Sequence, residues 1–164
     1  MAPPPNRPRA LWIEDGARSE LSHLSGPVLY DGRIELVLAE DLTTAVDYLL
    51  EEEFDAVIVD VRLPPGDDPY WKELHRKAGR DKVHAELGLQ LLRWLLGTEE
   101  RGGLPARPAW LTAKRVAVFS VDCKTEIMDT LHGLGIEVIQ QKRADLPDTI
   151  LRELIDRLLE ARGS

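Results

Sequence analysis

Short apolar runs alternate along the chain with longer stretches in which apolar residues recur every three or four positions. The runs, rich in β-branched residues, predict buried strands, and the wider spacing predicts helices with one buried face. The predicted strands span residues 10–14, 34–39, 54–59, 115–120 and 136–141. The predicted helices span residues 17–24, 42–50, 87–96, 124–134 and 147–161. Strict alternation of five strands with five helices favours an α/β fold, a parallel sheet with helices on both faces.

Several helix ends are predicted from single residues. The first helix is expected to stop before Gly26-Pro27, because proline cannot continue a helix. Asp41 or Thr43 is a candidate cap for the second helix. Pro147 suits the first turn of the last helix.

The length of the chain, 164 residues, suits one domain, predicted at 10–162. The Pro-rich start, 1–9, is predicted to be a flexible tail. Two connections are longer than ordinary loops: an insertion at 67–86, with room for one or two helical turns at 71–77, and a stretch at 97–114. The aromatic residues Tyr70 and Trp71 are expected to pack the insertion onto the body.

Composition excludes several classes of protein. The net charge of −8 argues against a nucleic-acid surface, which needs clustered Lys and Arg. No apolar run approaches the length of a membrane span, and no signal segment opens the chain. Cys123 is the only cysteine, so a reducing, cytoplasmic location is the expectation.

Polar residues stand at the ends of four predicted strands. Asp60 follows the run 54–59 and precedes a Pro/Pro/Gly loop, which places it at the carboxyl end of a central strand. The other strand-end residues are Glu14 and Asp15, Ser120, and Lys142. Parallel strands place such residues at one edge of the sheet, and the set suggests phosphoryl chemistry on a carboxylate.

With these residues the chain resembles, over about 10–161, the receiver domains of two-component response regulators. Leu63-Pro64 is similar to the hydrophobic-Pro pair that follows the phosphoacceptor of that family. The segment 86–92 is similar to its Gly-containing entry into a helix. The resemblance implies a flavodoxin-like, doubly wound sheet of five strands in the order 2-1-3-4-5.

The resemblance also implies a role for each strand-end residue. Asp60 is expected to accept the phosphoryl group, and Ser120 and Lys142 to contact it. The expected ligands of Mg²⁺ or Mn²⁺ are Glu14, Asp15, Asp60 and the backbone carbonyl of Arg62. Oxygen ligands suit Mg²⁺, and phosphoryl transfer depends on positioning and charge neutralisation.

Four features depart from the family pattern. Val121 stands where a small residue is usual, and Ile139 where an aromatic residue acts as a rotamer switch. Arg62 and Asp122 carry opposite charges, so we expect an ion pair across the mouth of the site and, with Val121, a gate. The insertion at 67–86 starts beside Asp60 and is expected to cover it.

The favoured function is a regulatory phosphoacceptor domain, not an enzyme, with at most self-phosphorylation from small donors and autodephosphorylation. Its expected partners are a histidine kinase or phosphotransfer protein and an unknown downstream protein, and a homodimer remains open. Neither nucleic acid nor a membrane is expected as a partner.

Other interpretations remain open. One is a receiver-like interaction module that is not phosphorylated. Another is an enzyme, either a phosphatase of the haloacid-dehalogenase type or a Toprim nuclease, but both need a second acid where this chain has Arg62. Taken singly, Asp60 fits a solvated strand-end acid, Glu14-Asp15 a helix cap, and Lys142-Arg143 a solvated basic patch.

Overall fold

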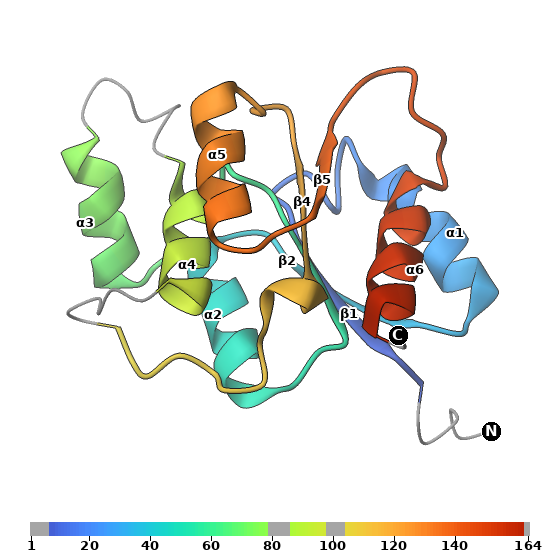
Figure 1. The fold of residues 1–164 in the computed structure, drawn as a ribbon, viewed down its shortest axis with the longest axis horizontal. Helices are drawn as coiled ribbons and strands as arrows, with labels where there is room; N and C mark the ends of the chain where they lie inside the picture. Colours follow the sequence, from blue (N-terminus) through green and yellow to red (C-terminus); the bar gives the residue numbers. More distant parts are fainter. Residues whose placement is uncertain (1–6, 79–85, 98–103, 163–164) are drawn as a thin grey trace.

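The computed structural model describes residues 7–78, 86–97 and 104–162. A five-stranded parallel sheet crosses the centre of the molecule, and helices cover both of its faces (Figure 1). The strands are β1 Arg9–Ile13, β2 Glu35–Ala39, β3 Ala56–Val59, β4 Val116–Ser120 and β5 Val138–Gln141. Their order is β2-β1-β3-β4-β5, and every neighbouring pair is parallel. The predicted fold class and strand order are confirmed.

The described residues form six α-helices, one more than predicted. They are α1 Ser25–Asp31, α2 Leu42–Glu51, α3 Pro69–Lys77, α4 Leu87–Leu96, α5 Thr125–Gly133 and α6 Ile150–Arg162. Short 3₁₀ turns precede α1 at Ser22–Leu24 and β4 at Ala113–Arg115.

The core has two layers, one on each face of the sheet. Along β1, Leu11 and Ile13 belong to the layer under α2, α4 and α5, whereas Ala10 and Trp12 belong to the layer under α1 and α6. This alternation is the two-residue period of a strand with both faces covered. The central strands β3 and β4 are buried at every residue, which explains why their runs are continuously apolar.

The prediction of a first helix at 17–24 is wrong. That segment forms turns and the 3₁₀ turn, and α1 instead starts at Ser25 and includes Gly26-Pro27. Pro27 is the third residue of α1, where a backbone N–H has no partner within the helix, so proline costs no hydrogen bond there. Gly32, with φ 71°, ends the helix in the left-handed conformation.

Two other helix starts are now defined. The side chain of Asp41 accepts a hydrogen bond from the N–H of Thr44 at 2.7 Å, so Asp41 is the cap of α2. The last helix begins at Ile150, three residues after the predicted Pro147, because the carbonyl of Pro147 closes a turn with the N–H of Ile150.

The predicted tail ends one residue too late, because Arg9 is the first residue of β1. Its N–H donates to Asp55 at 2.8 Å, and its guanidinium pairs with Glu35 and Glu52, both at 2.9 Å. These partners come from other elements, so the pattern along the chain did not reveal them. The rest of the predicted tail, residues 1–6, lies outside the described residues.

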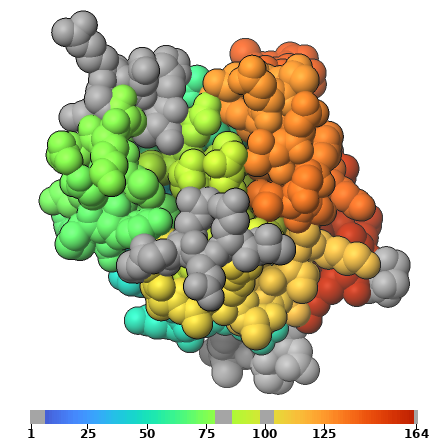
Figure 2. Space-filling model, turned by 60° about the vertical axis from the view of Figure 1, so that its left-hand side comes forward, coloured from blue at the N-terminus to red at the C-terminus, as the bar shows by residue number. Residues whose placement is uncertain are grey.

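The insertion contains a full helix, α3, which begins at Pro69 and is capped by the side chain of Asp68. Trp71 is buried in the core layer that also contains residues of α4, and α3 lies beside α4 (Figures 1 and 2). The expectation that Trp71 packs the insertion onto the body is confirmed. Residues 79–85 of the insertion and 98–103 of the second connection lie outside the described residues.

Candidate functional site

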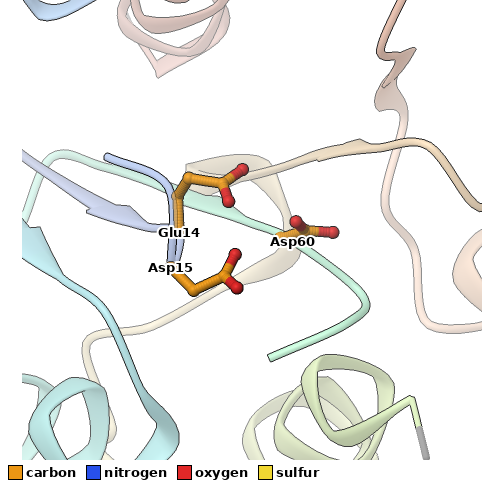
Figure 3. A group of neighbouring side chains, drawn as sticks. All are labelled: Glu14, Asp15 and Asp60. Carbon is orange, nitrogen blue, oxygen red and sulfur yellow. The ribbon is translucent and has the colours of Figure 1, made fainter. Parts of the chain in front are cut away.

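Three carboxylates meet at the carboxyl edge of the sheet (Figure 3). Glu14 and Asp15 directly follow β1, and Asp60 directly follows β3, whose last residue pairs with the last residue of β1. One ligand oxygen from each carboxylate lies within 4.8 Å of the others. Asp15 is exposed, whereas Glu14 and Asp60 are only 2% and 5% exposed. The expectation that Asp15 and Asp60 meet at one end of the sheet is confirmed.

Lys142 binds two of these acids. It follows β5, and its Nζ donates to Asp60 Oδ2 at 2.7 Å and to Glu14 Oε1. Only 15% of its side chain is exposed, so the interpretation of Lys142 as part of a solvated basic patch is wrong. The neighbouring Arg143 points to solvent and pairs with Asp145.

The acids outnumber the cations bound to them. Burial, together with the charge of Asp60, raises the pKa of Glu14 to about 8, although Lys142 opposes this rise. Burial acts to lower the pKa of Lys142, but the charges of Asp60 and Glu14 outweigh it, and the pKa is raised. A lysine that stays charged beside three acids leaves the site short of positive charge, which favours a bound cation.

The oxygen atoms present fit a divalent cation. Glu14, Asp15 and Asp60 offer the carboxylate ligands that Mg²⁺ and Mn²⁺ prefer, and exposed Asp15 leaves one side open to water. Few protein ligands with retained waters are typical of Mg²⁺.

The loop after β4 forms the other wall of the site. Ser120 is fully buried, and its Oγ accepts a hydrogen bond from the N–H of Asp122 at 3.2 Å. Arg62 donates to Asp122 Oδ2 through Nη2 at 3.1 Å and Nε at 3.3 Å, so the expected ion pair is present. The N–H of Arg62 also donates to Asp60 Oδ1 at 3.3 Å. Val121 is 55% exposed beside this pair.

Gly88 packs against the backbone at the end of β3 that carries Asp60, a role that the sequence pattern did not reveal. Its N–H donates to the carbonyl of Val61 at 2.8 Å, and a Cβ atom at this position would lie 1.9 Å from the carbonyl oxygen of Asp60. Only glycine permits so close an approach of helix and strand end. A glycine near the start of an apolar helical stripe was the available signal.

No family model matches the sequence, and no curated protein matches it. Solved structures are similar over nearly the whole chain. A response regulator from Thermotoga maritima aligns with a TM-score of 0.56 and 18% identity, covering 94% of this chain and 99% of that one. The receiver domain of the Francisella response regulator 1452 aligns with a TM-score of 0.58 and 15% identity, covering 96% and 99%.

A third similar structure is the beryllofluoride-activated N-terminal receiver domain of RstA from Klebsiella pneumoniae. It aligns with a TM-score of 0.55 and 17% identity, covering 92% of this chain and 97% of that one. The chain has the receiver fold. At these identities the likeness concerns the fold, so the function of this receiver fold is argued from its site.

Ile139, on β5, is half-buried and packs against the core. Its side chain has no polar group, so a change of rotamer would not form or break a hydrogen bond. In the described part of the chain, no helix is both long enough and apolar enough to cross a membrane.

Proposed function

We propose that this receiver fold accepts a phosphoryl group on Asp60 from a histidine kinase or a phosphotransfer protein. The observation that carries the proposal is the buried Asp60 carboxylate, bound by Lys142 and within 4.8 Å of oxygens of Glu14 and Asp15. A single strand-end acid has no need of these neighbours, whereas phosphoryl transfer to a carboxylate requires them to supply charge and position.

In the reaction an oxygen of Asp60 forms a bond to phosphorus while the bond from phosphorus to the donor breaks, and the donor leaves with the electron pair. Glu14, Asp15, Asp60 and the backbone carbonyl of Arg62 would hold Mg²⁺ or Mn²⁺. When bound, the ion supplies the charge neutralisation that lets a carboxylate attack an anionic phosphoryl group.

Lys142 stays charged and donates from Nζ, first to Asp60 and then to a phosphoryl oxygen. Ser120 lies at the end of the neighbouring strand, where its hydroxyl can donate to another phosphoryl oxygen. The phosphorylated state would then change contacts with a downstream protein partner, so the domain acts as a regulator, not as an enzyme.

The test is the intact mass of the protein after incubation with acetyl phosphate and Mg²⁺. Wild type should gain about 80 Da, the mass of one added PO₃H group. Asp60→Asn should abolish this gain, whereas the control Asp129→Asn, at an exposed acid on α5, should keep it. A gain that persists in Asp60→Asn contradicts the assignment of Asp60.

The contacts that Asp60 and its neighbours already make favour a second function, a receiver-like interaction module that is not phosphorylated. Lys142 already occupies oxygens of both Glu14 and Asp60, and Arg62 with Asp122 lies beside the acceptor. An unchanged mass with acetyl phosphate, phosphoramidate and Mg²⁺ or Mn²⁺ would support this module over the phosphoacceptor.

A further inference from the structure

An ion pair joins the loop after Ser120 to the start of α4. Lys124 lies directly before α5, Glu86 lies directly before α4, and Lys124 Nζ is 3.0 Å from Glu86 Oε1. The hydrogen bond with Glu86 raises the pKa of Lys124, so the lysine is charged at neutral pH. The pair therefore connects two segments that are far apart in the sequence.

Glu86 has a strained backbone. Its φ of 51° and ψ of 41° place it in the left-handed region, and it is the one non-glycine residue with positive φ among those described. A residue with a Cβ atom adopts this conformation only where its surroundings hold it there. The carbonyl of Glu86 accepts hydrogen bonds from the N–H groups of Leu89 and Gln90, so this backbone also forms the first turn of α4.

The start of α4 also touches the phosphoacceptor strand. The N–H of Gly88 is bonded to the carbonyl of Val61, and the backbone of Gly88 lies directly against the carbonyl of Asp60. The first turn of α4 is thus held on one side by the end of β3 and on the other by the side chain of Lys124.

We propose that the Lys124–Glu86 ion pair transmits the state of the Ser120 loop to the start of α4. This inference rests on the proposed phosphorylation of Asp60. When the Ser120 hydroxyl turns toward a phosphoryl group, it loses the hydrogen bond that its Oγ accepts from the N–H of Asp122. The loop that carries Lys124 is then released. Without Lys124, Glu86 relaxes out of the left-handed region and the first turn of α4 opens.

The proposed coupling runs from the Ser120 loop to α4, and it differs from a signal that passes through β5. Ile139 has no polar tip, so β5 lacks an aromatic switch. In contrast, α4 packs against α3, and the two helices form one face of the molecule together with α5 (Figure 2). A change at the start of α4 therefore reaches α3, the helix of the insertion.

The first test needs no phosphorylation. Amide hydrogen exchange at Leu89 and Gln90, followed by NMR, should be about threefold faster or more in Lys124→Ala than in wild type. The charge-swapped double variant, Lys124→Glu with Glu86→Lys, should restore the wild-type rate to within about twofold. The control Lys114→Ala, at an exposed lysine before β4, should change nothing. Unchanged exchange in Lys124→Ala overturns the coupling.

A variant at Glu86 tests the strain. Glu86→Gln and Glu86→Gly both remove the ion pair, but glycine occupies the left-handed region at little cost. Exchange at Leu89 and Gln90 should therefore rise less in Glu86→Gly than in Glu86→Gln. Equal increases in the exchange rate in both variants would show that backbone strain at Glu86 plays no part in the coupling.

The second test adds beryllofluoride and Mg²⁺. In wild type, exchange should change both in the loop at 121–124 and at Leu89 and Gln90. In Lys124→Ala the loop should still respond, while the response of α4 should be lost. A wild type whose loop responds without α4 overturns the coupling alone, and phosphorylation of Asp60 still stands. A silent loop together with no mass gain from acetyl phosphate overturns the proposed function and this route with it.

Discussion

The two ends of the sheet carry clusters of charged residues that differ in one respect. At the amino end each arginine has its own acids: Arg9 pairs with Glu35 and Glu52, Arg115 with Glu53, and Arg162 with Asp55. At the carboxyl end Lys142 binds both Glu14 and Asp60, and Asp15 lies in the same cluster. The amino end therefore has three arginines for four acids and is nearly balanced in charge. The carboxyl end has one lysine for three acids and is short of positive charge.

Burial makes this difference matter. The pairs at the amino end are partly exposed, and water screens them, so they contribute little to the free energy of unfolding. Glu14 and Asp60 are buried, and this burial, together with the charge of Asp60, raises the pKa of Glu14 to about 8. A folded protein tolerates such a cluster where a bound ion or a reaction uses it, which makes it the better guide to function.

The largest effect is expected from removing Lys142, the cation of the carboxyl end. Lys142→Ala leaves buried acids without a partner and should lower the free energy of unfolding by about 3 kcal/mol in EDTA. Mg²⁺ should restore much of this loss, since the metal ligands remain. Urea unfolding with and without Mg²⁺ measures both values.

Arg9→Ala is the matched change at the amino end. Because its ion pairs are partly exposed, we expect a loss of about 1 kcal/mol with no dependence on Mg²⁺. Equal losses and equal Mg²⁺ dependence in the two variants would break the comparison between the ends.

Asp15→Ala should weaken Mg²⁺ binding in calorimetry, whereas Lys142→Ala should leave Mg²⁺ binding largely intact.

The second effect concerns the support of the carboxyl end. Gly88→Ala should cost about 2 kcal/mol and slow phosphorylation, because the added Cβ lies 1.9 Å from the carbonyl of Asp60 and forces the helix and the strand end apart. Gly133→Ala is the control, since its Cβ would meet nothing within 4 Å. Thermal unfolding and the rate of mass gain test both variants. A Gly88→Ala protein that behaves like wild type would contradict the close packing.

The third effect is a dependence of the free energy of unfolding on pH, which comes from Glu14 at the carboxyl end. The folded pKa of Glu14, about 8, lies above its ordinary value of 4.5, so the folded protein binds the proton more tightly. Its contribution to stability is complete below pH 4.5 and is lost as the pH rises through 8. Without metal, the free energy of unfolding of wild type should fall by at most about 1.4 kcal/mol per pH unit in this window, the limit for one proton.

Glu14→Gln isolates the contribution of Glu14 to the pH dependence of the free energy of unfolding, because glutamine does not titrate. The difference between wild type and Glu14→Gln, from denaturant unfolding in EDTA at several pH values, should therefore shrink toward pH 4.5 and grow toward pH 8. A difference that stays constant across the window would show that Glu14 titrates normally.

The smallest effect on stability is expected at the mouth of the site. Replacing Arg62 and Asp122 together with alanine removes a pair worth about 0 to 1 kcal/mol. Its effect should be kinetic: a more open mouth admits water to the acyl phosphate and shortens its lifetime. Decay of the mass adduct in the double variant and in wild type measures this, and equal lifetimes would refute a gate of Arg62, Val121 and Asp122.

The pattern of apolar residues is enough to predict the sheet and the edge that carries the candidate site. Burial on both faces requires continuous apolar runs such as that ending at Val59, and burial on one face requires a helical stripe such as that of α4. Strand ends follow from those runs, so the sequence predicts that Asp60, Glu14 and Lys142 lie at one edge of the sheet.

Contacts between distant segments depend on how the elements pack, and the local pattern does not encode them. The start of α1 was missed because Gly26-Pro27 stops a helix in its interior but not in its first turn, and sequence pattern does not distinguish the two. The Lys124–Glu86 pair left no periodic signal, because two charged residues on different elements meet only after the chain has folded. Local periodicity records which residues are buried, whereas the pairing of buried or strained groups depends on how the elements pack.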